Sequence, residues 1–166
     1  MKKFITFEGG EGTGKSTQAK LLFSSIKNTS ETVILTREPG GTKIAEEIRK
    51  IIVKNNFNLN RLSEFLLIYA ARNEHLKDTI IPSLDKGHMV ICDRFLDSTF
   101  VYQVQGKRID KKIFRYFNNL IIKDYKPEIT FIIDIDPKIG IERSLKLKKK
   151  ETKYEKLSLS FHEKIR

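Results

Sequence analysis

A glycine-rich loop that carries one lysine, followed directly by a serine, comes after the first apolar run of the sequence, in FEGGEGTGKST at residues 7–17. Gly9, four further residues, and then Gly14, Lys15 and Ser16 match the Walker A spacing for phosphate binding. Glycine allows main-chain N–H groups to turn toward phosphate oxygens, and the lysine adds a positive charge. The loop predicts an ATP site formed by Gly9, Gly10, Glu11, Gly12, Thr13, Gly14, Lys15, Ser16 and Thr17, with the Ser16 hydroxyl as a Mg²⁺ ligand.

Such a loop does not by itself define the reaction, because GTPases, ATPases and small-molecule kinases share it. A GTPase is expected to carry an NKxD-type segment that recognises the base. The asparagine-containing segments NNFN and NNL lack the required lysine and acid. Motor-type ATPases are usually larger and carry additional arginine fingers. A small-molecule kinase is therefore the favoured class.

The elements that must position this loop can be predicted from the hydrophobic pattern. Short, continuous apolar runs predict strands that are buried on both faces of a sheet. Amphipathic segments between them predict helices, and Pro137 is typical of a first helical turn. The order β-α-β-α-α-β-α-α-β-α favours a parallel sheet with helices on both faces, a three-layer α/β/α sandwich. The predicted strands are residues 4–8, 32–36, 89–93 and 129–135, and the predicted helices are residues 15–27, 44–54, 62–85 (one or two) and 111–124.

Three polar stretches follow predicted strands: GGEGTGKS, REPGGT and DRF. Ligands of open parallel sheets bind beyond the carboxyl ends of the strands. We therefore expect the three stretches to meet in one site.

Length and composition favour a single globular domain over residues 1–166. No window approaches the roughly 18 apolar residues of a membrane span, so no membrane association is expected. The only cysteine, Cys92, excludes an internal disulfide, favours a cytoplasmic location and is expected to be a buried core thiol. The net charge of +11 is compatible with an anionic partner, and equally with a composition rich in Lys, Ile and Asn.

Further motifs carry a resemblance to a known family. TREPGGT, LLIYAARNEH, GHMVICDRFLDST and VYQ follow in this order between residues 36 and 103. Together with the glycine-rich loop they resemble bacterial thymidylate kinases, from Phe4 to about Arg166. The resemblance implies a P-loop kinase with a mobile lid near residues 146–156, which phosphorylates dTMP to dTDP with ATP and Mg²⁺. It also implies a homodimer, for which the apolar face of residues 62–69 is a candidate contact, although burial in the monomer explains the same residues.

The resemblance also implies residue roles. Arg94 would clamp the acceptor phosphate, because a planar guanidinium offers paired donors. Asp93 is placed like a Walker B acid and could hold Mg²⁺ through water, and Glu11 would accept a hydrogen bond from the 3′-hydroxyl of the acceptor. Tyr102 would lie near the sugar and disfavour a 2′-hydroxyl. The remaining acceptor residues are Arg37 beside the EPGG turn, Ile68 and Arg72 at the thymine, and Ser98 and Gln103 in the nucleoside pocket. The Glu38–Pro39 peptide bond is a candidate for the cis form.

The sequence departs from the family pattern in three places. The position after Glu11 is Gly12 and the predicted lid, KLKKKETKYEK, contains no arginine. The catalytic cation would then come from Lys148, Lys149, Lys150 or Lys153 of the lid, or from Arg143 on the preceding helix. Ile68 stands where the family usually places a phenylalanine that stacks on thymine. The family continues past Arg166 with a strand and a helix, so we expect these elements to be missing from this sequence.

The implied reaction does not require a general base, because a phosphate monoester with a second pKa near 6 is already ionised at neutral pH. His75, His88 and His162 are accordingly expected to be structural or solvated. Another P-loop nucleoside or nucleoside-monophosphate kinase remains an alternative, as does an inactive fragment. A lysine-rich nucleic-acid-binding module is less favoured, since aromatic residues do not alternate with the basic ones.

Overall fold

The computed structural model describes residues 3–54, 57–146 and 153–166. Four parallel strands form one sheet in the order β2-β3-β1-β4. Their bounds are Phe4–Glu8 for β1, Val33–Arg37 for β2, Met89–Asp93 for β3 and Ile129–Ile132 for β4. Because β1 lies between β3 and β4, the loop that follows it starts near the middle of the sheet.

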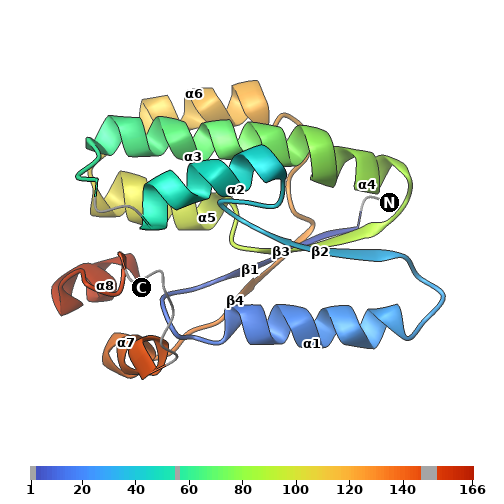
Figure 1. The fold of residues 1–166 in the computed structure, drawn as a ribbon, viewed down its shortest axis with the longest axis horizontal. Coiled ribbons are helices and arrows are strands. Elements are labelled where there is room, and N and C mark those ends of the chain that lie inside the picture. Colours follow the sequence, from blue (N-terminus) through green and yellow to red (C-terminus); the bar gives the residue numbers. More distant parts are fainter. Residues whose placement is uncertain (1–2, 55–56, 147–152) are drawn as a thin grey trace.

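Helices cover both faces of this sheet, as Figure 1 shows: α1 lies on one face, and α2, α3 and α6 lie on the other. The predicted three-layer α/β/α architecture is therefore confirmed, and the solved structure compared below supports it. The helices are α1 Lys15–Lys27, α2 Lys43–Arg49, α3 Arg61–His75, α4 Ile81–Asp85, α5 Leu96–Thr99, α6 Lys111–Ile121, α7 Pro137–Lys146 and α8 Leu159–Ile165. The π-helical segments η1 Lys50–Lys54, η2 Leu76–Ile80 and η3 Phe100–Gly106 follow directly on α2, α3 and α5.

The predicted burial of the fourth strand is wrong. β4 is three residues shorter than the predicted run, and all of its residues are exposed, with 74% of Ile132 accessible to solvent. A continuous apolar run indicates burial on both faces, but within the described part of the chain β4 is an edge strand that pairs only with β1. Its position in the sheet overrides its composition.

The predicted helix at 44–54 also differs from the structure. It is divided into α2 and η1, and the Thr42 hydroxyl caps its start by accepting from the Ala45 N–H (3.1 Å). Ile44 and Ile51 are 56% and 37% exposed, whereas Ile52 is fully buried. A π-helical segment adds residues to a turn and so rotates the apolar stripe away from the α-helical spacing.

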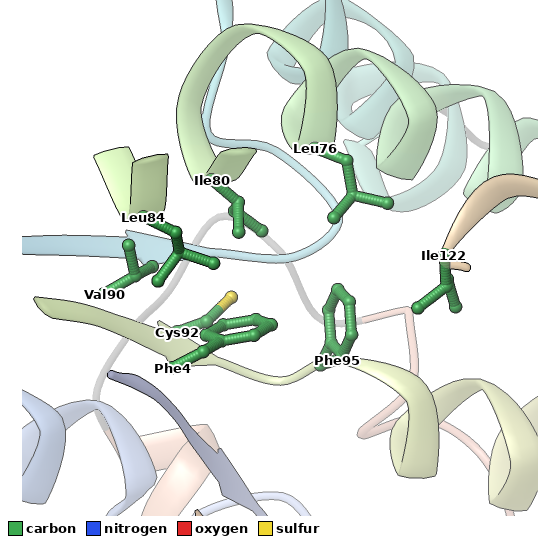
Figure 2. Packing of buried hydrophobic residues seen from close by; sticks show 8 residues of the cluster. All are labelled: Phe4, Leu76, Ile80, Leu84, Val90, Cys92, Phe95 and Ile122. Carbon is green, nitrogen blue, oxygen red and sulfur yellow. The ribbon is translucent and has the colours of Figure 1, made fainter. Parts of the chain in front are cut away.

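Apolar side chains pack on both faces of the sheet because neighbouring strand residues point in opposite directions. Val90 and Cys92 of β3 point to the face that Leu76, Ile80 and Leu84 cover, as Figure 2 shows. The other face packs Phe7, Val33 and Ile91 against Ala19 of α1. Cys92 is the buried core thiol that was predicted, and burial raises its pKa. In the described ranges, no helix combines the length and the apolar character that crossing a membrane requires.

Candidate active site

The glycine-rich loop connects β1 to α1 at the carboxyl edge of the sheet. Gly9, Gly12 and Gly14 have positive φ angles of 143°, 65° and 99°, as the sequence predicted. At Gly12 any side chain would also collide, because a Cβ atom would lie 1.8 Å from the carbonyl oxygen of Gly140 in α7. The loop therefore packs directly against α7, and its amides precede a helix N-terminus, which is a favourable place for an anion.

Lys15 is the first residue of α1 and is almost fully buried. Its ammonium group donates to the carbonyl oxygen of Gly10 and to the Thr13 hydroxyl (3.3 Å). Burial lowers the pKa of Lys15 to about 7, and the nearby charge of Arg94 adds to this effect. A bound polyphosphate would favour the charged form, because opposite charges at short distance stabilise each other.

Ser16 and Asp93 lie side by side, although 77 positions separate them. The Ser16 hydroxyl donates to Oδ2 of Asp93, while Oδ1 of Asp93 is buried and has no hydrogen-bond partner among the described residues. An unpaired carboxylate oxygen beside a hydroxyl offers the hard oxygen ligands that Mg²⁺ prefers. Mg²⁺ is commonly held by one or two protein oxygens together with substrate phosphates and water, so this pair fits the predicted metal position.

A second cluster forms around Arg94, which directly follows β3 and has a positive φ of 72°. Its Nη1 donates to the Gly9 carbonyl (3.0 Å) and to the Ser98 hydroxyl (2.9 Å), and its Nη2 donates to Oε1 of Glu11 (3.0 Å). The Tyr102 hydroxyl donates to the same Glu11 oxygen (2.6 Å), and its ring lies 5.2 Å from the Arg94 guanidinium. The structure thus brings four predicted acceptor-side residues together on the glycine-rich loop.

Charges in this cluster keep Glu11 ionised. Burial alone would raise its pKa, but the positive charges of Arg94 and Lys15 outweigh burial and lower the pKa below its ordinary value. The carboxylate can therefore accept hydrogen bonds at neutral pH, which is the role predicted for it.

Arg72 of α3 is completely buried and lies between two aromatic rings, those of Tyr69 and Phe95, each 5.1 Å from its guanidinium. Its Nε donates to Glu38 (2.7 Å), and its Nη2 donates to the Phe95 carbonyl (3.0 Å) and the Thr99 hydroxyl (2.8 Å). Its Nη1 is buried and has no partner within the described ranges. Since buried donors are almost always paired, this nitrogen is available for a ligand acceptor.

Glu38 holds Arg72 in place and was not among the predicted site residues. It is buried, precedes a cis peptide bond to Pro39 as predicted, and also lies 3.1 Å from Nδ1 of His75. Arg72 and His75 lower the pKa of Glu38 although burial opposes them. His75 is also within 2.6 Å of the Thr36 hydroxyl, so its buried, bridging position agrees with the structural role expected for it.

Glu8 is a second residue that sequence reasoning missed. Its buried carboxylate accepts from the Phe95 N–H (2.7 Å) and from the Ser98 hydroxyl (2.5 Å), and burial raises its pKa. It therefore fixes the turn that carries Arg94. The only sequence signal was an acid at the end of an otherwise apolar strand.

Three predicted acceptor residues have other partners in the structure. Arg37 forms an exposed ion pair with Glu46 (2.8 Å), the buried Gln103 amide donates to Glu64 (3.1 Å), and Ile68 packs against Ile52 and Val53. Their roles in substrate binding stay predictions.

The predicted catalytic cations do not share one location in the structure. Lys148, Lys149 and Lys150 lie outside the described residues. Arg143 lies on an exposed part of α7, one turn after the contact between Gly140 and the loop. Lys153 donates to Oε2 of Glu64 and to the Ile52 carbonyl, both at 2.8 Å. The catalytic roles of Arg143 and Lys153 stay predictions.

Comparisons with known proteins agree on one family. A family model described as "Thymidylate kinase" matches residues 7–166. The thymidylate kinase of Wolbachia pipientis wMel is 46% identical over 165 residues, which cover 98% of this chain and 81% of that protein. The thymidylate kinase of Magnetococcus marinus is also 46% identical, over 99% of this chain and 79% of that protein. Among solved structures, thymidylate kinase from Ehrlichia chaffeensis matches with a TM-score of 0.75 and 47% identity, over 80% of this chain and 75% of that chain.

Proposed function

The chain belongs to the thymidylate kinase family, and from this premise we propose how its site transfers the γ-phosphoryl group of ATP to dTMP, giving ADP and dTDP. One observation carries the assignment of the two nucleotides. Arg94 donates both to the backbone of the glycine-rich loop and to Glu11 within it. A phosphate held by Arg94 would therefore lie beside the phosphates held by the loop.

ATP binds on the donor side of this arrangement. The loop amides and the N-terminus of α1 face its phosphates, and Lys15 regains its full charge against them. Mg²⁺ would be held by the Ser16 hydroxyl and by Asp93, whose Oδ1 lacks a partner within the described part of the chain. When bound there, the ion would supply positive charge that offsets the charge of the phosphates.

dTMP binds on the acceptor side. Arg94 and Ser98 face its phosphate, Glu11 accepts from its 3′-hydroxyl, and Tyr102 packs against the sugar. The free Nη1 of Arg72 donates to the carbonyl edge of thymine, and Ile68 contributes dispersion contacts only. Gln103 of η3 and Arg37 at the end of β2 border this pocket.

Transfer proceeds without a protein base, because the attacking phosphate oxygen is already ionised at neutral pH. The main barrier is repulsion between two polyanions, and fixed positive groups in a water-poor site offset it. Arg143 is the protein cation that we assign to the transferring group. Lys153 is engaged with Glu64, whereas Arg143 has no hydrogen-bond or ion-pair partner among the described residues.

We further propose a homodimer in the cytoplasm. The helices α3 and α6 are neighbours (Figure 1). Both carry exposed apolar side chains, which we assign to the contact as the α3 and α6 surface: Leu62 and Leu66 on α3, and Ile113, Tyr116 and Leu120 on α6. An exposed apolar surface of this kind is typical of a protein–protein contact. The single, buried thiol of Cys92 suits a reducing compartment.

The test is an acceptor panel with ATP and Mg²⁺, in which ADP formation is followed for dTMP, dUMP, dCMP, dGMP and thymidine. We expect turnover with dTMP and weaker turnover with dUMP, which lacks only the methyl group. Lys15→Ala is the control, because it removes the loop charge and should reduce turnover by at least about 100-fold. Equal turnover by wild type and Lys15→Ala, or a preference for another acceptor, would contradict the proposal.

A further inference from the structure

Glu64 of α3 is a buried carboxylate to which the mechanism above assigns no task. It is fully inaccessible to solvent, and four donors converge on it. Its Oε1 accepts from Gln103 (3.1 Å), Lys107 (2.6 Å) and Tyr154 (3.2 Å), and its Oε2 accepts from Lys153 (2.8 Å). These donors come from η3 with the turn that follows it and from residues 153–154, so the carboxylate joins two separate segments to α3.

The charge of Glu64 is essential to this junction. Burial alone would raise its pKa, but hydrogen bonds and charges from Lys107 and Lys153 outweigh burial and lower it. The carboxylate is therefore ionised at neutral pH and lies between two partly buried ammonium groups. Without its charge, the two cations would face each other with no counter-ion, and the segments that carry them would separate.

This junction lies directly behind the acceptor side of the site. Gln103 is the neighbour of Tyr102 in the chain. Tyr154 packs the edge of its ring on Tyr102, with ring centroids 5.3 Å apart and planes at 81°. Tyr102 in turn donates to Glu11. Glu64 thus holds two neighbours of Tyr102. Gln103 follows Tyr102 in the chain, and Tyr154 packs its ring on Tyr102 in the fold.

The segment that carries Tyr154 is held at a second point. Glu155 accepts from the Ser144 hydroxyl of α7 (2.7 Å), and α7 contacts the glycine-rich loop through Gly140. Residues 153–155 therefore bridge α3 and α7.

We propose that Glu64 is a positioning residue for the acceptor nucleotide: it holds Gln103 and Tyr154 so that Tyr102 keeps its hydroxyl on Glu11. The inference rests on the proposed function, since it concerns how dTMP is held. It also gives Lys153 a structural task, as a counter-ion of Glu64.

The first test is Glu64→Gln in the intact chain, because the amide has the size of the carboxylate but lacks its charge. The KM for dTMP should rise by about tenfold and the KM for ATP should stay within about twofold, since coupling between neighbouring buried groups is of this order. Calorimetric titration with dTMP should show the same loss of affinity without turnover. A change confined to the ATP side, or no change in either measurement, would overturn the inference.

A double-mutant cycle separates positioning from general destabilisation. Tyr102→Phe removes the hydroxyl through which Glu64 is proposed to act. In the Tyr102→Phe background, Glu64→Gln should raise the KM for dTMP by less than about threefold. A full tenfold effect in both backgrounds would mean that Glu64 acts independently of Tyr102, and the inference would be wrong.

Two milder variants keep the test decisive if Glu64→Gln does not fold. Lys153→Met retains the aliphatic stem but removes one counter-ion, and should raise the KM for dTMP by about threefold. Lys156→Met is the matched control, because Lys156 is exposed, lies three positions further along the chain and is not one of the four donors to Glu64. Equal KM values for these two variants would overturn the inference.

The two proposals fail differently. A wild-type chain that neither binds nor phosphorylates dTMP would contradict the proposed function. A wild-type chain that does both, with Glu64→Gln and Lys153→Met unchanged, would contradict the role of Glu64 alone.

Discussion

Two arginines dominate the site at the scale of single residues, the buried Arg72 and the partly buried Arg94, and a carboxylate holds each of them. Arg72 pairs with Glu38 (2.7 Å) and Arg94 pairs with Glu11 (3.0 Å). In Arg72 the donor nitrogen Nη1 remains without a partner among the described residues. The positive charges proposed to bind two anions are therefore compensated within the protein itself.

Lys15 should take up a proton when ATP binds. Its pKa of about 7 in the free protein lies below the ordinary value of 10.5, so most Lys15 side chains are neutral at pH 8. Polyphosphate restores the charged form, and about one proton per site should be taken up at pH 8 but far less at pH 6. Calorimetric titration in buffers of different ionisation enthalpy measures this uptake. Lys15→Met should abolish it, and uptake that persists in Lys15→Met would assign the proton to another group.

Glu38→Gln should destabilise the fold, because it leaves Arg72 buried without a counter-ion. The free energy of unfolding in urea should fall by about 3 kcal/mol at pH 7. Glu38 has a lowered pKa in the folded state, so its stabilisation is complete above the ordinary value of 4.5 and is lost as the pH falls through the lowered value. The difference between wild type and Glu38→Gln should accordingly shrink only below about pH 4.5.

Glu31→Gln is the matched control for this experiment, since Glu31 forms an exposed pair with Lys3. Exposed ion pairs contribute less than about 1 kcal/mol. Similar losses of unfolding free energy for Glu38→Gln and Glu31→Gln would show that the buried pair contributes no more to stability than an exposed pair.

The residue types in the sequence predicted much of the site, but they did not predict which side chains pair with one another. Walker A spacing predicted Lys15 and Ser16, and the resemblance supplied Arg72 and Arg94. Glu8, Glu38 and Glu64 were missed because an acid in a sequence does not indicate burial. Lys153 and Glu64, for example, meet across 89 positions.

At the scale of elements, α7 and the glycine-rich loop approach each other closely through their backbones. A Cβ atom at Gly140 would lie 2.3 Å from the carbonyl oxygen of Glu11. The contact is formed by the backbone of α7 on one side and the backbone of the loop on the other, so α7 cannot accommodate an added side chain at Gly140 without displacing the loop. The position of α7 and the shape of the phosphate cradle are therefore linked.

Gly140→Ala should weaken ATP binding by at least about tenfold, although alanine favours a helix by about 1 kcal/mol over glycine. The clash is with backbone, and overpacking of this kind costs about 1–3 kcal/mol. Calorimetric ATP titration measures the loss. Glu142→Ala, at an exposed position of the same helix, should bind ATP like the wild type. ATP affinity unchanged by Gly140→Ala would show that α7 and the loop move independently.

Hydrophobic pattern predicted the central elements well and the edge poorly. β1, β3 and α1 begin and end where predicted. The two strands each pair with a neighbour on both sides, and α1 starts directly at the glycine-rich loop that the sequence identifies. The segment at 44–54 and β4 differ because a π-helical segment and an edge position are tertiary properties that local pattern does not encode.

At the scale of the whole molecule, the two faces of the sheet carry different surfaces. The α3 and α6 surface lies on the face opposite to α1 (Figure 1). Leu66→Glu places a charge in this surface, where Leu66 is 42% exposed, and should convert a dimer to a monomer in sedimentation experiments. Leu21→Glu on α1, where Leu21 is 59% exposed, should leave the assembly unchanged. Dissociation by both variants, or a wild-type monomer, would contradict the proposed contact.

The aromatic rings and hydrogen bonds around Arg72 have a thermodynamic consequence for base recognition. A flexible arginine gives up rotamer entropy of up to about 2 kcal/mol when it becomes ordered. Here that loss occurs when the chain folds, since Tyr69, Phe95 and Glu38 already immobilise the side chain. In the proposed mode of dTMP binding, the nucleobase would therefore meet a preorganised donor, and association should follow a single fast phase without a slow rearrangement of α3.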